Sequence, residues 1–564
     1  MRVIQTMDPH SLQSSMLPQP ELSDQVICDL SNIYTLFSTL GHITSRVATD
    51  DGNVILEELL SLDASIIKSI ERTQCAQRVL LSAQENVQDL IHTIQTMMAP
   101  VRKLPPELLC EIKRHYLSLD EFIQLPPPDI CGQPSLLVFG QVCRQWRRVA
   151  LMTPESWSSL HITIPQTLDN CKANRLKSLI HLLLERSENC SLRIRFTVFP
   201  VSITGEGWPA HTTNGLALRA VFEPFLLHAH RWWEVDFDIT YAALEALLKD
   251  DALVSLPVPC LEAFHIRGDF GANDTRRLFN NPFRPLIKLS LAPALRRVSL
   301  FHVGLLAASG SSFSWSQLDE LSAVGFFPGQ IFFDCVTALQ GCQRLTRCRI
   351  STSEYTRAFL NGAPIVLPSL EYLHIDEHGV PDGNGDLYLH MICSNLRELL
   401  IHFVAPARHN IQNHHLFWTC ERISTFLSRA PRVRQLQLWD LPLDAGGLVE
   451  VLSFVPSLTH LTIGDLGSVC SITNQLLHEL TLPLTRSEKR IPLKCLESIH
   501  IESRSCSEHY ILGLVKSRCP SAHSASRLKR LRLYLPGTGQ TATLRGSLEK
   551  FRHNGLNLDI RGSW

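Results

Sequence analysis

The sequence predicts an α/β protein in which an N-terminal helical hairpin (coiled coil) and a small helical segment precede an irregular solenoid of repeated strands and helices. Three observations lead to this prediction: a long heptad pattern of apolar residues, two short amphipathic helices around a proline-rich connection, and a leucine-rich unit that recurs to the end of the chain. The boundaries that we predict are 1–21 for a disordered lead, 22–99 for the hairpin, 100–162 for the small helical segment and 163–564 for the repeats.

The first helical pattern begins at Leu22, after a polar, proline-containing lead, and a turn-like stretch interrupts it at 48–53. A second, longer helix follows, and the short turn favours an antiparallel pair of helices. Because the second helix is longer than the first, part of its apolar seam stays uncovered unless a homodimer forms through the coiled coil, and the sequence leaves both arrangements open. The seam consists of Leu59, Leu62, Ile66, Ser69, Thr73, Ala76, Leu80, Ala83, Val87, Leu90, Ile94 and Met97.

Two short helices are predicted between residues 104 and 160. The first follows the pair Pro105 and Pro106, which suits a helix start, and the second ends before Pro154. A segment this small buries little surface, so part of its apolar face is expected to contact other residues. Those residues belong either to a partner chain or to the larger core of the same chain.

The order of residues in this segment resembles an F-box, in the form found in the expanded F-box family of mushroom-forming fungi. The matching positions are Leu104, Pro105, Glu107, Leu108, Leu109, Ile112, Val142, Cys143, Arg144, Trp146, Arg147, Ala150, Pro154 and Trp157. The chain departs from the pattern at Lys113 and Arg114, and its connection at 119–139 is longer than usual. The resemblance implies docking on a Skp-type adaptor, and thereby on a cullin ligase, through Leu104, Pro105, Leu108, Leu109, Ile112, Val142, Cys143 and Trp146.

The C-terminal part repeats a short unit: a leucine, two variable residues, an aliphatic residue, one variable residue and another aliphatic. One such unit cannot bury its own apolar side, whereas stacked units share a core. The pattern resembles an irregular leucine-rich-repeat solenoid with one strand per unit, and a set of ordinary α/β layers is the alternative. The copies are Cys260–Ile266, Ala294–Leu300, Arg344–Ile350, Ser369–Ile375, Asn395–Ile401, Arg432–Leu438, Ser457–Ile463, Cys495–Ile501 and Arg527–Leu533, and Gln317–Val324 is a weaker copy.

Side chains alternate along a strand, so the residue between the last two aliphatics of each unit, and the residue two positions on, share the face opposite the core. Aromatic, Arg and His residues gather there, as at recognition surfaces, although a solvated face without a ligand fits as well. The basic residues near 516–532 suggest an acidic or phosphorylated ligand. The substrate-binding candidates are His265, Arg267, Phe301, Arg349, His374, Asp376, His402, Gln437, Trp439, His500, Glu502, Arg532 and Tyr534.

The composition and short motifs do not favour binding to nucleic acid, a membrane, a metal or a cofactor, and they do not favour catalysis. Lys and Arg number 53 against 54 Asp and Glu, so nucleic acid or an anionic membrane is not the expected partner. The 17 cysteines are scattered without a CxxC pair, which suggests reduced thiols in a cytoplasmic or nuclear protein. No metal site, cofactor or catalytic motif is expected, because the candidate stretches lack the required spacing.

The sequence therefore predicts a non-enzymatic substrate receptor. The F-box would connect a Skp-type adaptor and cullin RING ubiquitin ligase to a protein substrate held by the leucine-rich repeats. The alternative is a scaffold outside any ligase complex that uses the coiled coil and repeats for protein binding.

Overall fold

The computed structural model describes residues 35, 52–98, 104–117, 122–125, 136–164, 168–198, 215–240, 243, 247, 256–269, 292–301, 315–324, 338–352, 364–378, 387–404, 420–465, 472–481, 493–504, 506–519, 528–536 and 541–562. The predicted lead and nearly all of the first hairpin helix lie outside these residues. The chain divides into two compact units, one of 1–112 with 143–146 and one of 113–142 with 147–564. No helix among the described residues is both long and apolar enough to cross a membrane.

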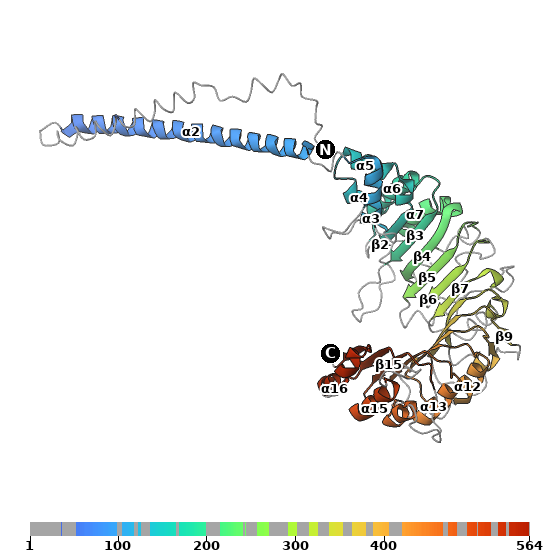
Figure 1. Ribbon diagram of the computed structural model, residues 1–564. Coiled ribbons are helices and arrows are strands. Elements are labelled where there is room, and N and C mark those ends of the chain that lie inside the picture. Colours follow the sequence, from blue (N-terminus) through green and yellow to red (C-terminus); the bar gives the residue numbers. More distant parts are fainter. Residues whose placement is uncertain are drawn as a thin grey trace. The chain divides into compact units, whose positions relative to one another are not determined.

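The first unit contains helix α2 (Gly52–Met98), a single helix of 47 residues (Figure 1). At 1.5 Å per residue its length is about 70 Å. Proline and glycine are absent from its interior, and the apolar residues keep the alternating spacing of three and four that the sequence analysis identified. The long apolar seam is thus displayed on one continuous helix.

Helix α3 (Pro106–Tyr116) begins at the proline pair, and its first turn closes through the Leu109 amide, which donates to the Pro105 carbonyl at 3.2 Å. Within the first unit, Gln145 Nε2 donates to the Leu104 carbonyl at 2.7 Å. Gln145 lies in α5 (Arg144–Leu151), so the beginning of each short helix belongs to this unit. The two halves of the LPPELL and VCRxWR pattern are joined here by a side-chain hydrogen bond.

The second unit opens with the remaining turns of α3 and α5. Lys113, which departs from the F-box pattern, is buried, and its Nζ donates to Ser156 Oγ at 2.8 Å. Trp157 is buried, and its Nε1 donates to the Ala150 carbonyl at 2.9 Å. A lysine is therefore tolerated at an apolar position because it has a polar partner. Short helical elements complete this part: α4 (Leu136–Phe139) and η2 (Pro154–Trp157).

Fifteen strands of the described residues form one parallel sheet in the order β1 to β8, β10 and β12 to β17 (Figure 1). Each unit of the sequence repeat ends in one of these strands. The bounds are β1 (Ile123–Leu125), β2 (Ser159–Ile164), β3 (Leu192–Val198), β4 (Trp232–Thr240), β5 (Ala263–Asp269), β6 (Arg297–Phe301), β7 (Glu320–Val324), β8 (Arg347–Thr352), β10 (Tyr372–His378), β12 (Glu398–Val404), β13 (Gln435–Trp439), β14 (His460–Asp465), β15 (Ser498–Ser503), β16 (Arg530–Tyr534) and β17 (Asn557–Arg561).

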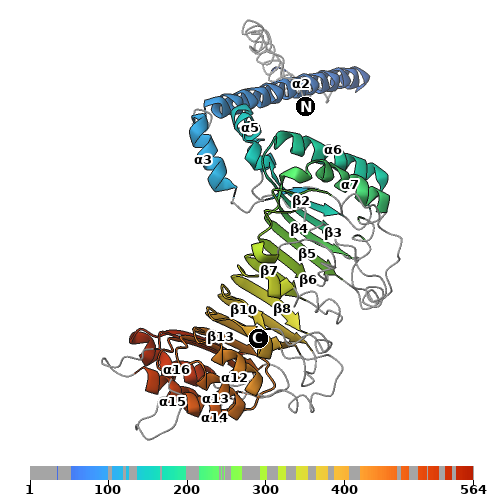
Figure 2. The same cartoon turned by 90° about the vertical axis from the view of Figure 1, so that its right-hand side faces the viewer.

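Helices connect several of these strands; α6 contacts α7, and from α11 to α16 each helix contacts the next (Figure 2). Within the described residues they are α6 (Asn170–Arg186), α7 (Gly215–Leu227), α11 (Leu387–His390), α12 (Cys420–Ser428), α13 (Ala445–Ser453), α14 (Asn474–Leu480), α15 (Glu508–Arg518) and α16 (Thr541–His553). Two short 3-10 turns, η3 (Ala229–Arg231) and η5 (Trp315–Gln317), precede strands, and β9 (Ile365–Val366) pairs with β11 (Met391–Ile392).

The core lies between the sheet and these helices. Phe222 of α7 contacts Phe196 of β3 and Phe237 of β4, with ring centroids 5.4 and 5.6 Å apart. The aliphatic residues of each strand that point the same way are buried, for example Leu436 and Leu438 in β13. The alternate residues therefore occupy the opposite face of the sheet.

Strand β1 lies inside the range 100–162 that we assigned to the small helical segment, and β2 begins inside it and ends at Ile164. Both β1 and β2 join the large sheet, and Ile123 pairs with Leu160. The stretch 159–164 alternates half-buried and buried residues, which is a strand pattern. The α/β class is as predicted; the structure adds that the strands form one large parallel sheet, which begins earlier in the chain than the predicted start of the repeats at 163.

Candidate functional site

The face of the sheet opposite the core carries three rows of side chains, which we call the polar face. Strand pairing in register aligns each row across the sheet. The first row contains Arg193, Glu234, Arg297, Glu320, Arg347, Tyr372, Glu398, His460 and Arg530. The second contains Arg195, Asp236, His265, Ser299, Arg349, His374, Gln437, His500 and Arg532, and the third contains Arg267, Phe301, Asp376, His402, Trp439, Glu502 and Tyr534.

All thirteen substrate-binding candidates lie in the second or third row of this face. The repeat determines this placement. The aliphatic residues of each strand point into the core, so the residues that alternate with them point to the opposite face. Whether these residues bind a substrate stays a prediction. The first row was not among the candidates, although it lies two residues before the second row and follows from the same alternation.

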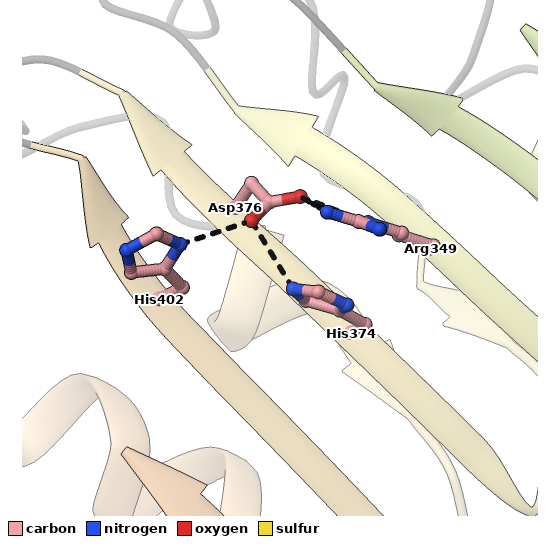
Figure 3. Close-up of polar contacts among 4 residues, drawn as sticks. All are labelled: Arg349, His374, Asp376 and His402. Atoms are coloured by element: carbon pink, nitrogen blue, oxygen red, sulfur yellow. Dashed lines mark hydrogen bonds and ion pairs between the residues drawn. The ribbon is translucent and has the colours of Figure 1, made fainter. Parts of the chain in front are cut away.

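Four residues in the middle of the polar face form a hydrogen-bonded cluster around Asp376, which is 5% exposed (Figure 3). Arg349 donates to Asp376 Oδ2 from Nε at 3.0 Å and from Nη2 at 2.9 Å. The imidazoles of His374 and His402 contact Asp376 Oδ1 through Nε2 at 3.1 Å and Nδ1 at 3.4 Å. Burial alone would raise the pKa of Asp376, but the hydrogen bonds from His374, His402 and Arg349 hold its pKa well below the ordinary value.

The cluster fixes the orientation of two partly exposed side chains. Arg349 and His402 are each about 40% exposed, at 43% and 41%, while Asp376 beneath them is ionised and buried. A carboxylate that accepts from three donors prevents those donors from adopting other rotamers. The side chains are thereby preorganised for contact with another molecule, which lowers the entropic cost of binding.

An aromatic residue adjoins this cluster on the next strand. Trp439 pairs in register with His402 on one side and with Gly464 on the other. A Cβ at position 464 would overlap the Trp439 ring, so only glycine allows the ring to lie over this part of β14. On the far side, the Trp439 and His500 rings meet edge to face with centroids 6.0 Å apart. The indole is thus held between two imidazole-bearing strands.

Toward the C-terminal end of the face, His500 is paired with Glu502 at 3.0 Å. Burial and the nearby Arg532 lower the pKa of His500 to about 4. Burial also lowers the pKa of His265 and of His460. These imidazoles are therefore neutral at pH 7, and a neutral imidazole has one ring nitrogen that donates a hydrogen bond and one that accepts.

The charges on the N-terminal strands of the face are paired with one another. Arg193 and Glu234 lie 3.1 Å apart, and Arg195 and Asp236 lie 2.9 Å apart. Part of the C-terminal basic stretch is paired as well: Arg532 lies 3.1 Å from Asp559, and Lys529 lies 2.9 Å from Glu497. Asp559 also pairs with Arg561 at 3.2 Å, so one carboxylate serves two arginines.

Arg518 lies in the basic stretch that suggested an acidic or phosphorylated ligand, and the structure corrects this prediction for Arg518. Its side chain is completely buried, and its guanidinium donates to the carbonyls of Leu480 and Leu493 at 2.6 to 3.0 Å. Burial lowers its pKa to about 10. Arg518 therefore holds the connections of α14 and α15 in place and does not face a ligand.

The predicted adaptor-binding residues differ in exposure. Leu108 is 51% exposed and Ile112 is 38% exposed, and both belong to the first unit. Leu109 is completely buried, so it belongs to the interior and is not part of an exposed contact surface. Helical spacing alone did not separate Leu108 from Leu109. Of the others, Pro105 and Val142 are exposed, and Leu104, Cys143 and Trp146 are partly exposed.

No protein-family model matches the sequence, and a comparison with curated proteins finds no match. Among the residues that the structure describes, no group of three or more His, Cys, Asp or Glu side chains is arranged to hold a metal ion. The cysteines of the described part are free thiols. The polar face and the exposed apolar residues of α3 are therefore the features of the described residues that bear on function.

Proposed function

We propose that this chain is a non-catalytic substrate receptor of an SCF-type cullin RING ubiquitin ligase in the cytoplasm or nucleus. In this proposal α3 acts as part of an F-box that docks on a Skp-type adaptor, and the strands and helices of the second unit act as a leucine-rich-repeat solenoid that holds the target protein. Ubiquitin transfer is left to other subunits of the complex.

The observation that carries the proposal is the exposure of Leu108 and Ile112 on the LPPELL helix. Two large apolar side chains one helical turn apart lie in solvent, next to Leu109, which is buried. Covering a leucine or isoleucine contributes roughly 1.5 to 3 kcal/mol, so an exposed pair at F-box positions favours a binding partner. The sequence resemblance supports a Skp-type adaptor as that partner.

The target would bind the polar face around Asp376 and Trp439. Preorganised Arg and His donors beside an aromatic ring are the residue types that dominate binding energy at protein interfaces. The same stretch has the ion pair of Arg349 with Asp376 and the neutral imidazole of His500 beside Trp439, which suits a target segment with mixed polar and apolar side chains better than a uniformly acidic one. One strand per repeat in parallel register supports the solenoid assignment.

The two activities can be separated by capturing full-length chains from cells under proteasome inhibition and identifying bound proteins by mass spectrometry. We expect the pair Leu108→Asp and Ile112→Asp to lose adaptor and cullin while keeping the target. The pair His402→Ala and Trp439→Ala should lose the target and keep the adaptor. Cys110→Asp, on the opposite side of α3, and Lys172→Ala, on α6, serve as matched controls that keep both.

Adaptor and cullin capture that is unchanged by the Leu108 and Ile112 substitutions would contradict the docking assignment. Recovery of target proteins without adaptor or cullin, from the unsubstituted chain, would support the alternative of a scaffold outside any ligase. Target capture that survives the His402 and Trp439 substitutions would remove the polar face from the proposal.

A further inference from the structure

The C-terminal half of α2 exposes a set of large apolar side chains that no described element covers. They recur at heptad spacing along about 16 residues, or roughly 24 Å of helix. Hydrophobic stretches of this kind on an isolated helix are costly in water and typically mark a contact with another helix. The exposed members are Val79, Leu80, Val87, Leu90, Ile91 and Ile94.

Burial along α2 changes near its middle. Leu62 and Ser69 are buried, and Ile66 and Ala76 are partly buried, whereas the seam from Leu80 to Ile94 is exposed. Nearly all of the first predicted helix, residues 22–47, lies outside the described residues. If these 26 residues form the predicted antiparallel helix, its length would be about 39 Å, and from the turn it would extend only to about the level of Val79. A helix of that length would leave the exposed seam uncovered.

The residues of this seam suit pairing with an identical helix. In the heptad frame, Val87 and Ile94 occupy the a position and Leu90 occupies the d position, and β-branched residues at a with leucine at d favour parallel two-stranded coiled coils. The flanking e and g positions from Val79 to Thr93 carry no charge. In the N-terminal half, by contrast, Glu58 at g and Asp63 at e would repel each other across a parallel homodimer.

We propose that residues Val79 to Ile94 of α2 form a parallel, in-register coiled coil with a second copy of this chain. The occupant follows from the seam itself: an identical helix supplies complementary a and d residues and brings no like charges together. The proposal goes beyond the proposed ligase function and does not depend on it. The dimer would carry two polar faces, which strengthens binding to a target with two sites.

The test is the mass of the purified full-length chain in solution, measured by sedimentation equilibrium over a range of concentrations. The unsubstituted chain, with a monomer mass of 63.5 kDa, should show a concentration-dependent dimer. The pair Leu80→Glu and Leu90→Glu should weaken dimerisation by at least about 100-fold, because it places carboxylates in the apolar seam. Leu81→Glu is the matched control: Leu81 is exposed like Leu80, but it occupies the b position and points away from the seam.

Orientation is tested by cysteine cross-linking under mild oxidation. With Ala83→Cys, at a d position, residue 83 of one copy should link to residue 83 of the other, whereas Ser82→Cys, at a c position, should not. Circular dichroism is the control for folding: each cysteine variant should keep the helix content of the unsubstituted chain. The proposal is overturned by a monomer at every concentration, by a dimer that survives the Leu80 and Leu90 substitutions, or by equal weakening with Leu81→Glu.

Discussion

The second unit and helix α2 use apolar residues in opposite ways. In the second unit the aliphatic residues of each strand and the rings of α7 are buried, and polar side chains occupy the free face of the sheet. In α2 and at the start of α3, large apolar residues such as Leu80, Leu90 and Leu108 are exposed. In the second unit, the burial of apolar residues stabilises the fold. In α2 and α3, the exposed apolar residues can become buried when a partner binds. Substitutions in the two regions should therefore change different measurements.

Phe222→Ala should give the largest loss of stability. Phe222 is buried against the rings of Phe196, Trp232 and Phe237, so its removal leaves a cavity in the core. We expect the free energy of unfolding to fall by about 4 kcal/mol, measured by urea denaturation. Leu108→Asp should change it by less than about 0.5 kcal/mol, because the side chain is half exposed. Equal losses for the two variants would remove the distinction between the regions.

Arg518→Met sharpens the same comparison with a polar core residue. The substitution keeps much of the side-chain volume but leaves the carbonyls of Leu480 and Leu493 without their buried donor. The free energy of unfolding should fall by about 2 to 3 kcal/mol. Lys516→Met, an exposed position on the same helix, is the control and should have little effect. An equal change in the free energy of unfolding for the two variants would mean that buried Arg518 stabilises the fold no more than the exposed Lys516 does.

Mild acid should destabilise the sheet. The pKa of His500 is about 4 in the folded chain and about 6.5 when unfolded, so between these values only the unfolded state takes up the proton. Stability is then lost as the pH falls from about 6.5 to about 4, by on the order of 2 kcal/mol for this residue. His500→Gln should flatten the dependence of unfolding free energy on pH in that window. An unchanged slope would mean that His500 is not the neutral, buried group described above.

Protonation of Asp376 affects the stability of the fold in a separate, lower range of pH. Its pKa is depressed in the folded chain, so its contribution is complete above the ordinary carboxyl value of 3.8 and is lost only as the pH falls below that value. Acid effects between pH of about 6.5 and about 4 therefore do not come from protonation of Asp376. Asp376→Asn should alter the profile only below this range.

The sheet was predictable because the repeat places each aliphatic at a fixed distance from the next. Strands such as β10 and β14 follow directly from the units at Ser369 and Ser457, and register then aligns the rows. The Asp376 cluster was harder to predict, because Arg349 and His402 come from neighbouring strands, 27 and 26 residues away. Their contacts depend on side-chain rotamers that periodicity does not specify.

Exposure on α3 could not be predicted from spacing alone. Leu108 and Leu109 are adjacent leucines in one motif, yet Leu109 is buried and Leu108 is half exposed. The helical pattern identifies an apolar side that includes both, and only the packing of the folded chain determines which residue points inward. The same applies to Arg518, whose charge suggested a surface position although the residue is buried among carbonyls.

The most direct measurement of the central claim is the affinity of the purified full-length chain for a purified Skp-type adaptor. It is measured by calorimetry, with the melting temperature recorded for the same samples. The account predicts that the unsubstituted chain and Cys110→Asp bind alike, and that Leu108→Asp with Ile112→Asp binds at least about 100-fold more weakly at an unchanged melting temperature. Absence of adaptor binding by the unsubstituted chain, or equal affinity in all three, would contradict the claim that α3 docks on the adaptor.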